Sequence, residues 1–268
     1  MNEMQLNWYP IASSSDLEPR HVFDAQLLGQ EIAAWRADDG YANVWENRCL
    51  HRGVRLSIGI NDGKELKCQY HGWRYSNRSA SCTYIPAHPA DAPARTVCNK
   101  RYPSQEKYGL VWTGLTPAGD LPTFEVLEDV PTQVLRSIPV NARSELVREW
   151  LPLCKFGSAE TLGWNNLTSF EDSSGAVVFI SEESRALVFL VQPVDAQRSV
   201  IRGIAAGIDQ DSLADLRHLN ACLTELRTKI EAAENEQPDL PQLKRNYARV
   251  DAELATMPDR VGTAGGRS

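Results

Sequence analysis

Hydrophobic and polar positions in the first part of the chain alternate over short runs, a pattern typical of β-strands. The segment HVFDAQLLGQEIAAWRADDGYANVWENR (21–48) has apolar runs on both sides of the turn signal Asp-Asp-Gly at 38–40. The segment NDGKELKCQYHGWRYS (61–76) repeats the design, and KYGLVWTGL (107–115) predicts a further strand. We therefore expect residues 1–118 to form an all-β domain.

The pattern changes after residue 118. Residues 119–142 are interrupted by prolines and predict a linker or an irregular crossing. Ser144 begins a helical pattern in SELVREWLPL that Pro152 should end. The segment GAVVFISEESRALVFLVQPVDAQRSVIRGIAAGI (175–208) contains three apolar runs, which predict three strands of a second sheet.

A long amphipathic helix is expected next, because large aliphatic residues recur at helical spacing: Leu213, Leu216, Leu219, Leu223, Leu226 and Ile230. A second short helix should begin after Pro241. The expected fold class is thus α+β, with an all-β domain at 1–118, a truncated, helix-grip-like α+β domain at 119–256, and a tail at 257–268.

Composition narrows the class of protein. The chain has 268 residues, 42% hydrophobic and 24% charged, with a net charge of −7. These values are ordinary for a globular protein, and the absence of any basic run argues against nucleic-acid binding. No stretch approaches the roughly 18 apolar residues that span a bilayer, and MNEMQLNWYP does not read as a signal peptide. We expect a cytoplasmic protein without a membrane partner.

Two short motifs carry the candidate chemistry. CLHRG provides Cys49 and His51, and CQYHGW provides Cys68 and His71. Each motif offers one thiolate and one imidazole, which suits a Rieske [2Fe–2S] centre, where two cysteines hold one iron and two histidines hold the other. We therefore assign these four residues as cluster ligands.

Other readings of the four residues fit less well. A Cys2His2 zinc finger pairs cysteine with cysteine and histidine with histidine, and places a helix between the pairs. Unrelated packing residues would have to meet four coincidences of spacing. The remaining cysteines are expected to be reduced and mostly buried thiols: Cys82, Cys98, Cys154 and Cys222.

Neighbouring residues indicate the type of cluster. Gly53 and Gly72 follow the two ligand pairs, where the backbone must fold tightly. Neither motif has the additional cysteine, nor the serine near a bridging sulfur, found in Rieske proteins of respiratory complexes, and Trp73 follows Gly72 instead. We expect a reduction potential near the low end of the Rieske range, about −150 mV.

On these stretches, together with NWYPIASSSDL, CTYIPAHP and YGLVWTGL, the chain resembles the large (alpha) subunit of Rieske non-haem iron oxygenases. The resemblance covers most of residues 7–116 and is strongest to the demethylase-like branch, which includes vanillate and caffeine demethylases. It implies a reductase or ferredoxin as electron donor and an oligomer based on a trimer, homo- or hetero-oligomeric.

Members of this family also hold a mononuclear iron in the second domain, through two histidines and a carboxylate. Only His21, His88 and His218 remain here, and residues 119–268 contain no histidine pair. An alignment to the family places the expected ligands near positions that cannot supply them as a set: Leu153, Phe156, Glu160 or Thr161, and Leu226. The mononuclear iron is therefore expected to be absent.

The segment DLRH has part of the spacing of a metal-binding motif, because Asp215 and His218 are three residues apart and Cys222 follows one turn later. The same helix needs its leucines for the core, so we favour a structural role for these three residues.

Three functions are compatible with these features. The first is an electron-transfer subunit of a multi-component hydroxylase or demethylase, not catalytic alone, that passes electrons from a reductase to a mononuclear iron on a partner oxygenase subunit. The second is a complete oxygenase with an atypical iron site that oxidises a small aromatic or N- or O-methyl compound. The third is a non-catalytic redox-sensing or assembly protein.

Overall fold

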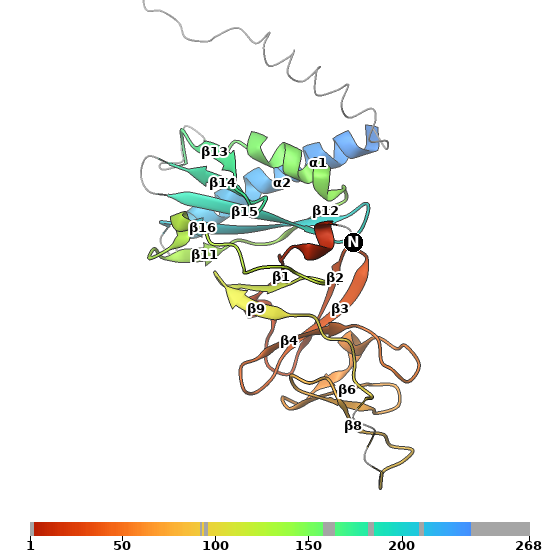
Figure 1. Ribbon diagram of the computed structural model, residues 1–268. Coiled ribbons are helices and arrows are strands. Elements are labelled where there is room, and N and C mark those ends of the chain that lie inside the picture. Colours follow the sequence, from red (N-terminus) through yellow and green to blue (C-terminus); the bar gives the residue numbers. More distant parts are fainter. Residues whose placement is uncertain are drawn as a thin grey trace, which may run out of the picture.

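The computed structural model describes residues 3–91, 93, 96–157, 164–181, 185–208 and 212–236. Its elements are stacked along one long axis (Figure 1). Two helices lie at one end on a six-stranded sheet, and three small sheets follow toward the other end. This arrangement confirms an all-β part followed by an α+β part.

The first half contains three antiparallel sheets joined by tight turns. A 3-10 turn (Glu3–Leu6) precedes the first strand, and two others (Ser14–Asp16 and Leu56–Ile58) lie between strands. The sheets have the strand orders β1-β10-β9, β2-β3-β4 and β5-β6-β7-β8. Their bounds are β1 (Tyr9–Ser13), β2 (Val22–Leu27), β3 (Gln30–Arg36), β4 (Ala42–Glu46), β5 (Ile60–Asn61), β6 (Glu65–Lys67), β7 (Arg74–Ser76), β8 (Cys82–Tyr84), β9 (Ser104–Lys107) and β10 (Leu110–Thr113).

Two turns in this half have no strong signal in the sequence. The segment 107–115 is not one strand, because Tyr108 and Gly109 have φ of 55° and 72° and turn the chain from β9 into β10. Leu28 and Gly29, with φ of 50° and 80°, likewise join β2 to β3. Paired positive φ values suit the twist of a two-residue hairpin, but leucine and tyrosine are unusual in that conformation.

The second half is built on a six-stranded antiparallel sheet. The three predicted strands are confirmed as β14, β15 and β16. The expectation of an irregular 119–142 agrees with residues 119–131 but is wrong for the two strands within 132–140. The segment 119–142 contains a 3-10 turn (Glu125–Leu127) and two short strands on β16. Proline is tolerated in such short outer strands, as Pro139 is here. The bounds are β11 (Thr132–Val134), β12 (Ile138–Val140), β13 (Thr168–Glu171), β14 (Val177–Ile180), β15 (Ala186–Pro193) and β16 (Ser199–Ala206).

Both predicted helices within the described residues are confirmed. Helix α1 (Ser144–Trp150) runs into a 3-10 turn (Leu151–Leu153) that contains Pro152. Helix α2 (Leu213–Glu236) buries Leu219, Leu223, Leu226 and Ile230 against the sheet. No helix in the described ranges has the length and apolar character needed to cross a membrane. The predicted helix after Pro241 and the tail lie outside those ranges.

The large sheet is covered on both faces. All eight residues of β15 are buried. On one face, Leu187 and Phe189 pack against the helices, and on the other, Val188 and Leu190 share a core with Trp112 of β10. The two halves of the chain are therefore held together by a common apolar core. The sequence-based boundary at residue 118 falls between β10 and β11 and stays a prediction.

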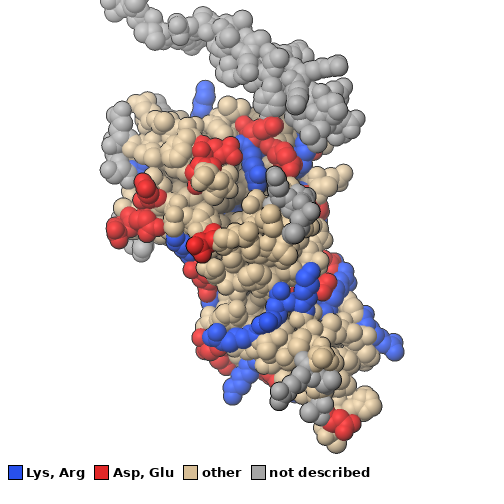
Figure 2. Space-filling view, viewed as in Figure 1, with Lys and Arg blue, Asp and Glu red and all other residues tan. Residues whose placement is uncertain are grey.

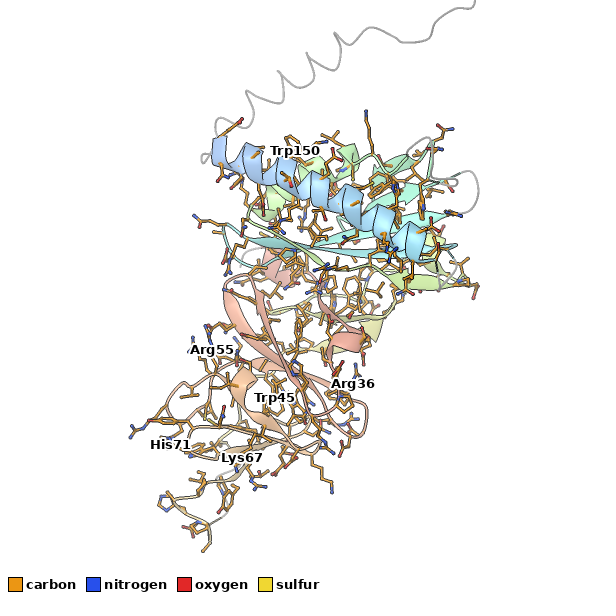
Figure 3. The ribbon with its side chains drawn as sticks, turned by 180° about the vertical axis from the view of Figure 1, so that it is seen from behind. Arg36, Trp45, Arg55, Lys67, His71 and Trp150 are labelled. Atoms are coloured by element: carbon orange, nitrogen blue, oxygen red, sulfur yellow. The ribbon has the colours of Figure 1, made fainter. Side chains whose placement is uncertain are left out.

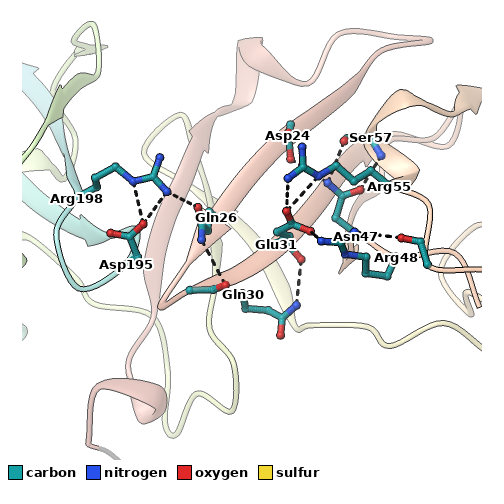
Figure 4. Close-up of polar contacts among 12 residues, drawn as sticks. Asp24, Gln26, Gln30, Glu31, Asn47, Arg48, Arg55, Ser57, Asp195 and Arg198 are labelled. Carbon is teal, nitrogen blue, oxygen red and sulfur yellow. Dashed lines mark hydrogen bonds and ion pairs between the residues drawn. The ribbon is translucent and has the colours of Figure 1, made fainter.

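A second contact joins the halves at the β2–β3 turn. The backbone N–H groups of Leu28 and Gly29 donate to the carbonyls of Pro193 (2.8 Å) and Val194 (2.7 Å). Nearby, the side chain of Gln192 donates to the carbonyl of Gln26 at 2.8 Å. Arg198 donates to the Oε1 atom of Gln26, also at 2.8 Å (Figure 4). Directional hydrogen bonds at this turn thus fix how the two halves pack, in addition to the shared apolar core.

Replacing Leu223 by alanine should lower the free energy of unfolding by about 3 kcal/mol, because a fully buried leucine leaves a cavity under α2. Leu213→Ala on the same helix is the matched control, since Leu213 is 62% exposed, and should change that free energy by less than about 0.5 kcal/mol. Urea unfolding of both variants measures the difference, and equal effects would contradict the packing described here.

Candidate metal centre

The two ligand motifs form loops with the same backbone hydrogen bonds. In the first loop the N–H of Cys49 donates to Val54 (2.8 Å) and that of Gly53 donates back to Cys49 (2.8 Å). In the second loop the N–H of Cys68 donates to Trp73 (2.8 Å), and that of Gly72 donates to Cys68 (3.0 Å). Both loops therefore span the same length, although the histidine comes one residue later in the second.

Glycine closes each loop for a conformational reason. Gly53 and Gly72 have φ of 69° and 70°, a region that other L-residues avoid. At Gly72 an added Cβ would also lie 3.2 Å from Pro86. The prediction that these positions require a tight backbone is confirmed.

A polar cluster braces the first loop from β3. Glu31 is paired with both Arg48 and Arg55 (Figure 4). Arg48 also donates to the carbonyl of Gly53 at 3.1 Å. The hydrogen bond from Arg55, aided by the charge of Arg48, lowers the pKa of Glu31, so the carboxylate stays ionised and holds the loop.

The four predicted ligands come together as a sulfur pair and a nitrogen pair. The Cys49 and Cys68 thiols, 3% and 2% exposed, lie within hydrogen-bonding reach of each other. The Nδ1 atoms of His51 and His71 are 2.9 Å apart, and both rings are exposed. Figure 3 places His71 at the end of the molecule opposite Trp150.

Burial and neighbouring charge act on both pairs. Burial raises the pKa of Cys68, and the nearby Cys49 adds to this, while the backbone N–H groups of Tyr70 and His71 act against it. Loss of solvent, the neighbouring His71 and the charge of Arg52 lower the pKa of His51. A lower pKa favours the neutral imidazole, which is the form that binds metal.

These donors fit a Rieske cluster better than a single ion. Two sulfurs on the inside and two nitrogens on the outside supply two ligands for each of two irons. The sulfurs and the nitrogens lie as two separate pairs, whereas a tetrahedral zinc site needs its ligands gathered around one ion. When bound, a [2Fe–2S] cluster takes up and releases one electron at a time.

Tyr75 also belongs to the candidate metal centre, although the two sequence motifs did not indicate it. Its hydroxyl lies 3.2 Å from the sulfur of Cys49 and accepts a hydrogen bond from the N–H of Leu50 at 3.1 Å. Burial raises the pKa of Tyr75 well above its usual value, so the hydroxyl keeps its proton. Strand alternation was the available signal, because Tyr75 on β7 points into the core that contains both cysteines.

Aromatic rings frame the two histidines. The indole of Trp73 stacks on His51 with the ring centroids 5.1 Å apart and 5° between the planes. Tyr70, which is 58% exposed, contacts His71 with a centroid distance of 3.8 Å. The histidine end thus combines two metal-binding rings with an exposed apolar rim that includes Leu50, 45% exposed.

Asp215, His218 and Cys222, the residues of α2 with metal-motif spacing, make structural contacts. Asp215 accepts hydrogen bonds from Trp164 (2.7 Å) and Ser212 (2.8 Å). His218 is bonded through Nε2 to the carbonyl of Phe156, and Cys222 lies 3.6 Å from the same nitrogen. These contacts link α2 to neighbouring segments.

Most of the positions aligned with the family's iron ligands are apolar. Phe156 is 1% exposed and packs against Phe179 and Phe189, at centroid distances of 5.1 and 5.5 Å. Leu226 belongs to the same core, and Leu153 is 49% exposed. Glu160 and Thr161 lie outside the described residues.

The remaining cysteines form no disulfide, as expected. The expectation that most are buried is wrong: Cys82 is buried, Cys154 and Cys222 are half-buried, and Cys98 is exposed. Cys98 forms an isolated β-bridge with Ser81, a contact between separate segments that the sequence pattern did not reveal.

Replacing Tyr75 by phenylalanine should lower the reduction potential of the reconstituted cluster. A hydrogen bond to a cluster sulfur stabilises the reduced, more negative form, and a difference of about 1 kcal/mol corresponds to ~40 mV for one electron. Redox titration followed by electron paramagnetic resonance measures the shift. Tyr84→Phe, at a partly exposed tyrosine on the neighbouring strand, is the control and should change the potential little.

Comparison with known proteins supports this geometry. The sequence profile of the Rieske [2Fe-2S] domain matches residues 7–108. The oxidoreductase NdmD of Pseudomonas putida is 45% identical over 149 residues, which are 55% of this chain and 25% of NdmD. The methylxanthine N1-demethylase NdmA of Pseudomonas putida is 28% identical over 151 residues, 53% of this chain and 42% of NdmA. The matched parts thus span less than half of each relative.

Solved structures extend the similarity of fold to the second half. NdmA from Pseudomonas putida with caffeine superposes with a TM-score of 0.69 at 19% identity, covering 85% of this chain and 82% of the other. Dicamba monooxygenase bound to dicamba gives a TM-score of 0.69 at 18% identity, covering 97% and 92%. Residues 7–108 are therefore a Rieske [2Fe-2S] domain, and the chain is related to the alpha subunits of Rieske non-haem iron oxygenases, the demethylase-like branch included.

Proposed function

We propose that this protein is an electron-transfer component of a Rieske oxygenase system, which receives electrons from a reductase or ferredoxin and passes them to a mononuclear iron on a partner subunit. The observation that carries the proposal is a contrast between the two halves. In the first half the four predicted ligands lie close together, with the two histidines exposed, while in the second half two of the positions aligned with iron ligands, Phe156 and Leu226, are buried in an apolar core.

His51 and His71 are the expected exit for the electron. Their Nδ1 atoms face each other, so the Nε2 atoms lie on the far sides of exposed rings. An Nε2–H group in this position is able to donate to a carboxylate of the partner, which would orient the ring and connect the two centres. Cys49 and Cys68, in contrast, are buried and anchor the cluster to the core.

The second half supports assembly more readily than oxygen activation. Phe156 and Leu226 belong to the core between sheet and helices, and the polar atoms of Asp215 and His218 are engaged in structural hydrogen bonds. A retained domain of this kind would position the chain in a homo- or hetero-oligomer based on a trimer, next to a subunit that has its own iron. We propose the cytoplasm as the location of the protein.

The relatives support a role in electron supply. NdmD, named an oxidoreductase, is 45% identical to this chain over the matched region, while NdmA, named a methylxanthine N1-demethylase, is 28% identical. The higher identity to the oxidoreductase favours an electron-carrying role for this chain. The names of the two relatives favour an N-demethylation system as the one in which it acts. A complete oxygenase is the second candidate, because solved oxygenases match the fold over most of this chain.

Charge indicates the kind of partner. Residues 1–118 contain 13 Lys and Arg against 12 Asp and Glu, whereas residues 119–268 contain 15 against 23. On the face shown in Figure 2, basic side chains form a row across the lower part of the molecule. Arg52, Lys67 and Arg74 are in or next to the ligand loops. A partner that exchanges electrons at this end should therefore present an acidic surface.

The isolated chain, purified without oxygen, should contain about two irons and two acid-labile sulfides and no additional iron. When chemically reduced it should not oxidise a methylxanthine on its own, and adding a partner subunit with an intact iron triad should restore turnover. Iron and sulfide analysis with product detection tests this. Three irons per chain, or turnover by the chain alone, would establish the complete oxygenase instead.

Reduction of the cluster by an acidic ferredoxin should slow by about tenfold between ~0.05 and ~0.5 M NaCl, because salt screens the attraction between the partners. At low salt, Arg52→Glu should slow the reaction several-fold. Arg217→Glu, an exposed arginine on α2 at the other end of the molecule, is the matched control and should leave the rate nearly unchanged. Stopped-flow absorbance measures all three rates, and equal effects of the two variants would contradict docking at the histidine end.

A further inference from the structure

Two polar residues interrupt the apolar face where the halves of the chain meet. Gln192 on β15 and Arg202 on β16 lie at the edge of the sheet face that packs toward β1, and they are 2% and 6% exposed. Valine, leucine and alanine occupy most other positions of that face. A charged side chain at such a site requires an explanation, since burying an unpaired ion is costly.

Hydrogen bonds within the protein involve only two of the three nitrogen atoms of the Arg202 guanidinium. Its Nε and Nη2 donate to Oε1 of Gln192 at 3.2 and 2.9 Å, and Nη2 also donates to the carbonyl of Ile11. Among the described residues the hydrogen bonds of this guanidinium involve only Nε and Nη2, and Nη1 is not one of the buried polar atoms that lack a partner, so Nη1 is accessible to solvent. No carboxylate within the described ranges forms an ion pair with this arginine. Burial lowers the pKa of Arg202 to about 10, and the charge of Asp16 opposes this. The side chain remains a cation at neutral pH.

A second buried arginine, Arg143, differs from Arg202 in having an acidic partner. Arg143 is 7% exposed, similar to Arg202, and its Nη1 is 3.0 Å from the carboxylate of Glu234. The two are the charged residues that the structure buries most completely among those it describes. Arg143 has its counter-ion inside the fold, whereas Arg202 has two neutral acceptors.

Arg202 lines a cleft of about 580 Å³ between the two halves. Phe23, Pro139 and Val200 supply apolar walls. The cleft also contains Arg55 and Arg198, but each already has an acid: Arg55 pairs with Glu31, and Arg198 pairs with Asp195 at 2.6 Å (Figure 4). Asp24 also lines the cleft and accepts a hydrogen bond from Asn47 at 2.9 Å. Among the described residues, Arg202 is thus the arginine of the cleft that has no ion pair with an acid.

We propose that this cleft binds a carboxylate group, with the Nη1 side of Arg202 as its anchor. A guanidinium that holds two neutral acceptors and keeps one nitrogen unpaired is suited to accept a carboxylate oxygen. The volume lies within the usual range for small-ligand sites, which often form where domains meet. The apolar walls favour an acid with a ring or an aliphatic body. The carboxylate belongs either to a free organic acid or to an Asp or Glu side chain of a second copy of this chain.

The probe for a free acid is benzoate, added to the full chain with its cluster. Benzoate at about 10 mM should raise the thermal unfolding midpoint by about 2–4 °C, since a ligand that binds only the folded state stabilises it. Benzamide, which has the same ring without the charge, should produce no shift. Arg202→Met should abolish the benzoate shift, while Arg198→Met, which removes a guanidinium already paired with an acid, should retain it.

Light scattering distinguishes the two sources of the carboxylate. If the chain is monomeric and benzoate stabilises it through Arg202, the ligand is a free acid. If the chain self-associates, and both benzoate and Arg202→Met weaken that association, the carboxylate comes from a second copy. Either result supports the proposal. Should Arg202→Met fail to fold, Arg202→Lys retains the charge without the planar fork and should weaken benzoate binding at least about threefold.

Other outcomes would overturn the inference. No benzoate shift together with no Arg202-dependent association would show that the cleft binds no carboxylate. Equal loss of the shift in Arg202→Met and Arg198→Met would show a general charge effect without a specific anchor. The visible absorbance of the cluster monitors the Rieske centre in every variant, so failure here leaves the electron-transfer proposal untouched.

Discussion

Burial of one sheet on both faces is the constraint on which the rest of the structure depends. Strand β15 is buried along its whole length, between the helices on one side and β1 and β10 on the other. Because apolar area removed from water is the main source of stability, separating the halves would expose the residues of the core that they share, Trp112 of β10 and Val188 of β15 among them. The Rieske half is therefore anchored at its base, and its loops project from the opposite end.

The ligand loops show how a small β domain holds four donors with little backbone. Two hydrogen bonds and a glycine at positive φ define each loop, and the cysteine side of each loop packs into the core formed around Trp45 and Tyr75. The histidines remain outside that core. This division between a buried sulfur pair and an exposed nitrogen pair results from the direction of each side chain within the same loop geometry.

Much of this could be predicted from the sequence, because the signals were local. The ligand spacing, the Asp-Gly turns, the apolar runs of the second sheet and the leucine periodicity of α2 each depend on neighbouring residues. The turns at Leu28 and Tyr108 were missed because their residues rarely adopt positive φ. The strands within 119–142 were missed because their pairing with β16 is a long-range contact. Tyr75 and Arg202 were recognised only when distant segments were seen to meet.

The common core and the hydrogen bonds at the β2–β3 turn have a consequence for how electrons move. Some carriers are tethered heads that swing between donor and acceptor on a flexible stalk. Here Leu28 and Gly29 are bonded to the connection after β15, and β10 shares its core with the large sheet, so hydrogen bonds and apolar contacts hold the Rieske half against the second half. In the electron-transfer function proposed above, donor and acceptor would each come to the histidine end, and they would either take turns there or approach it from different sides.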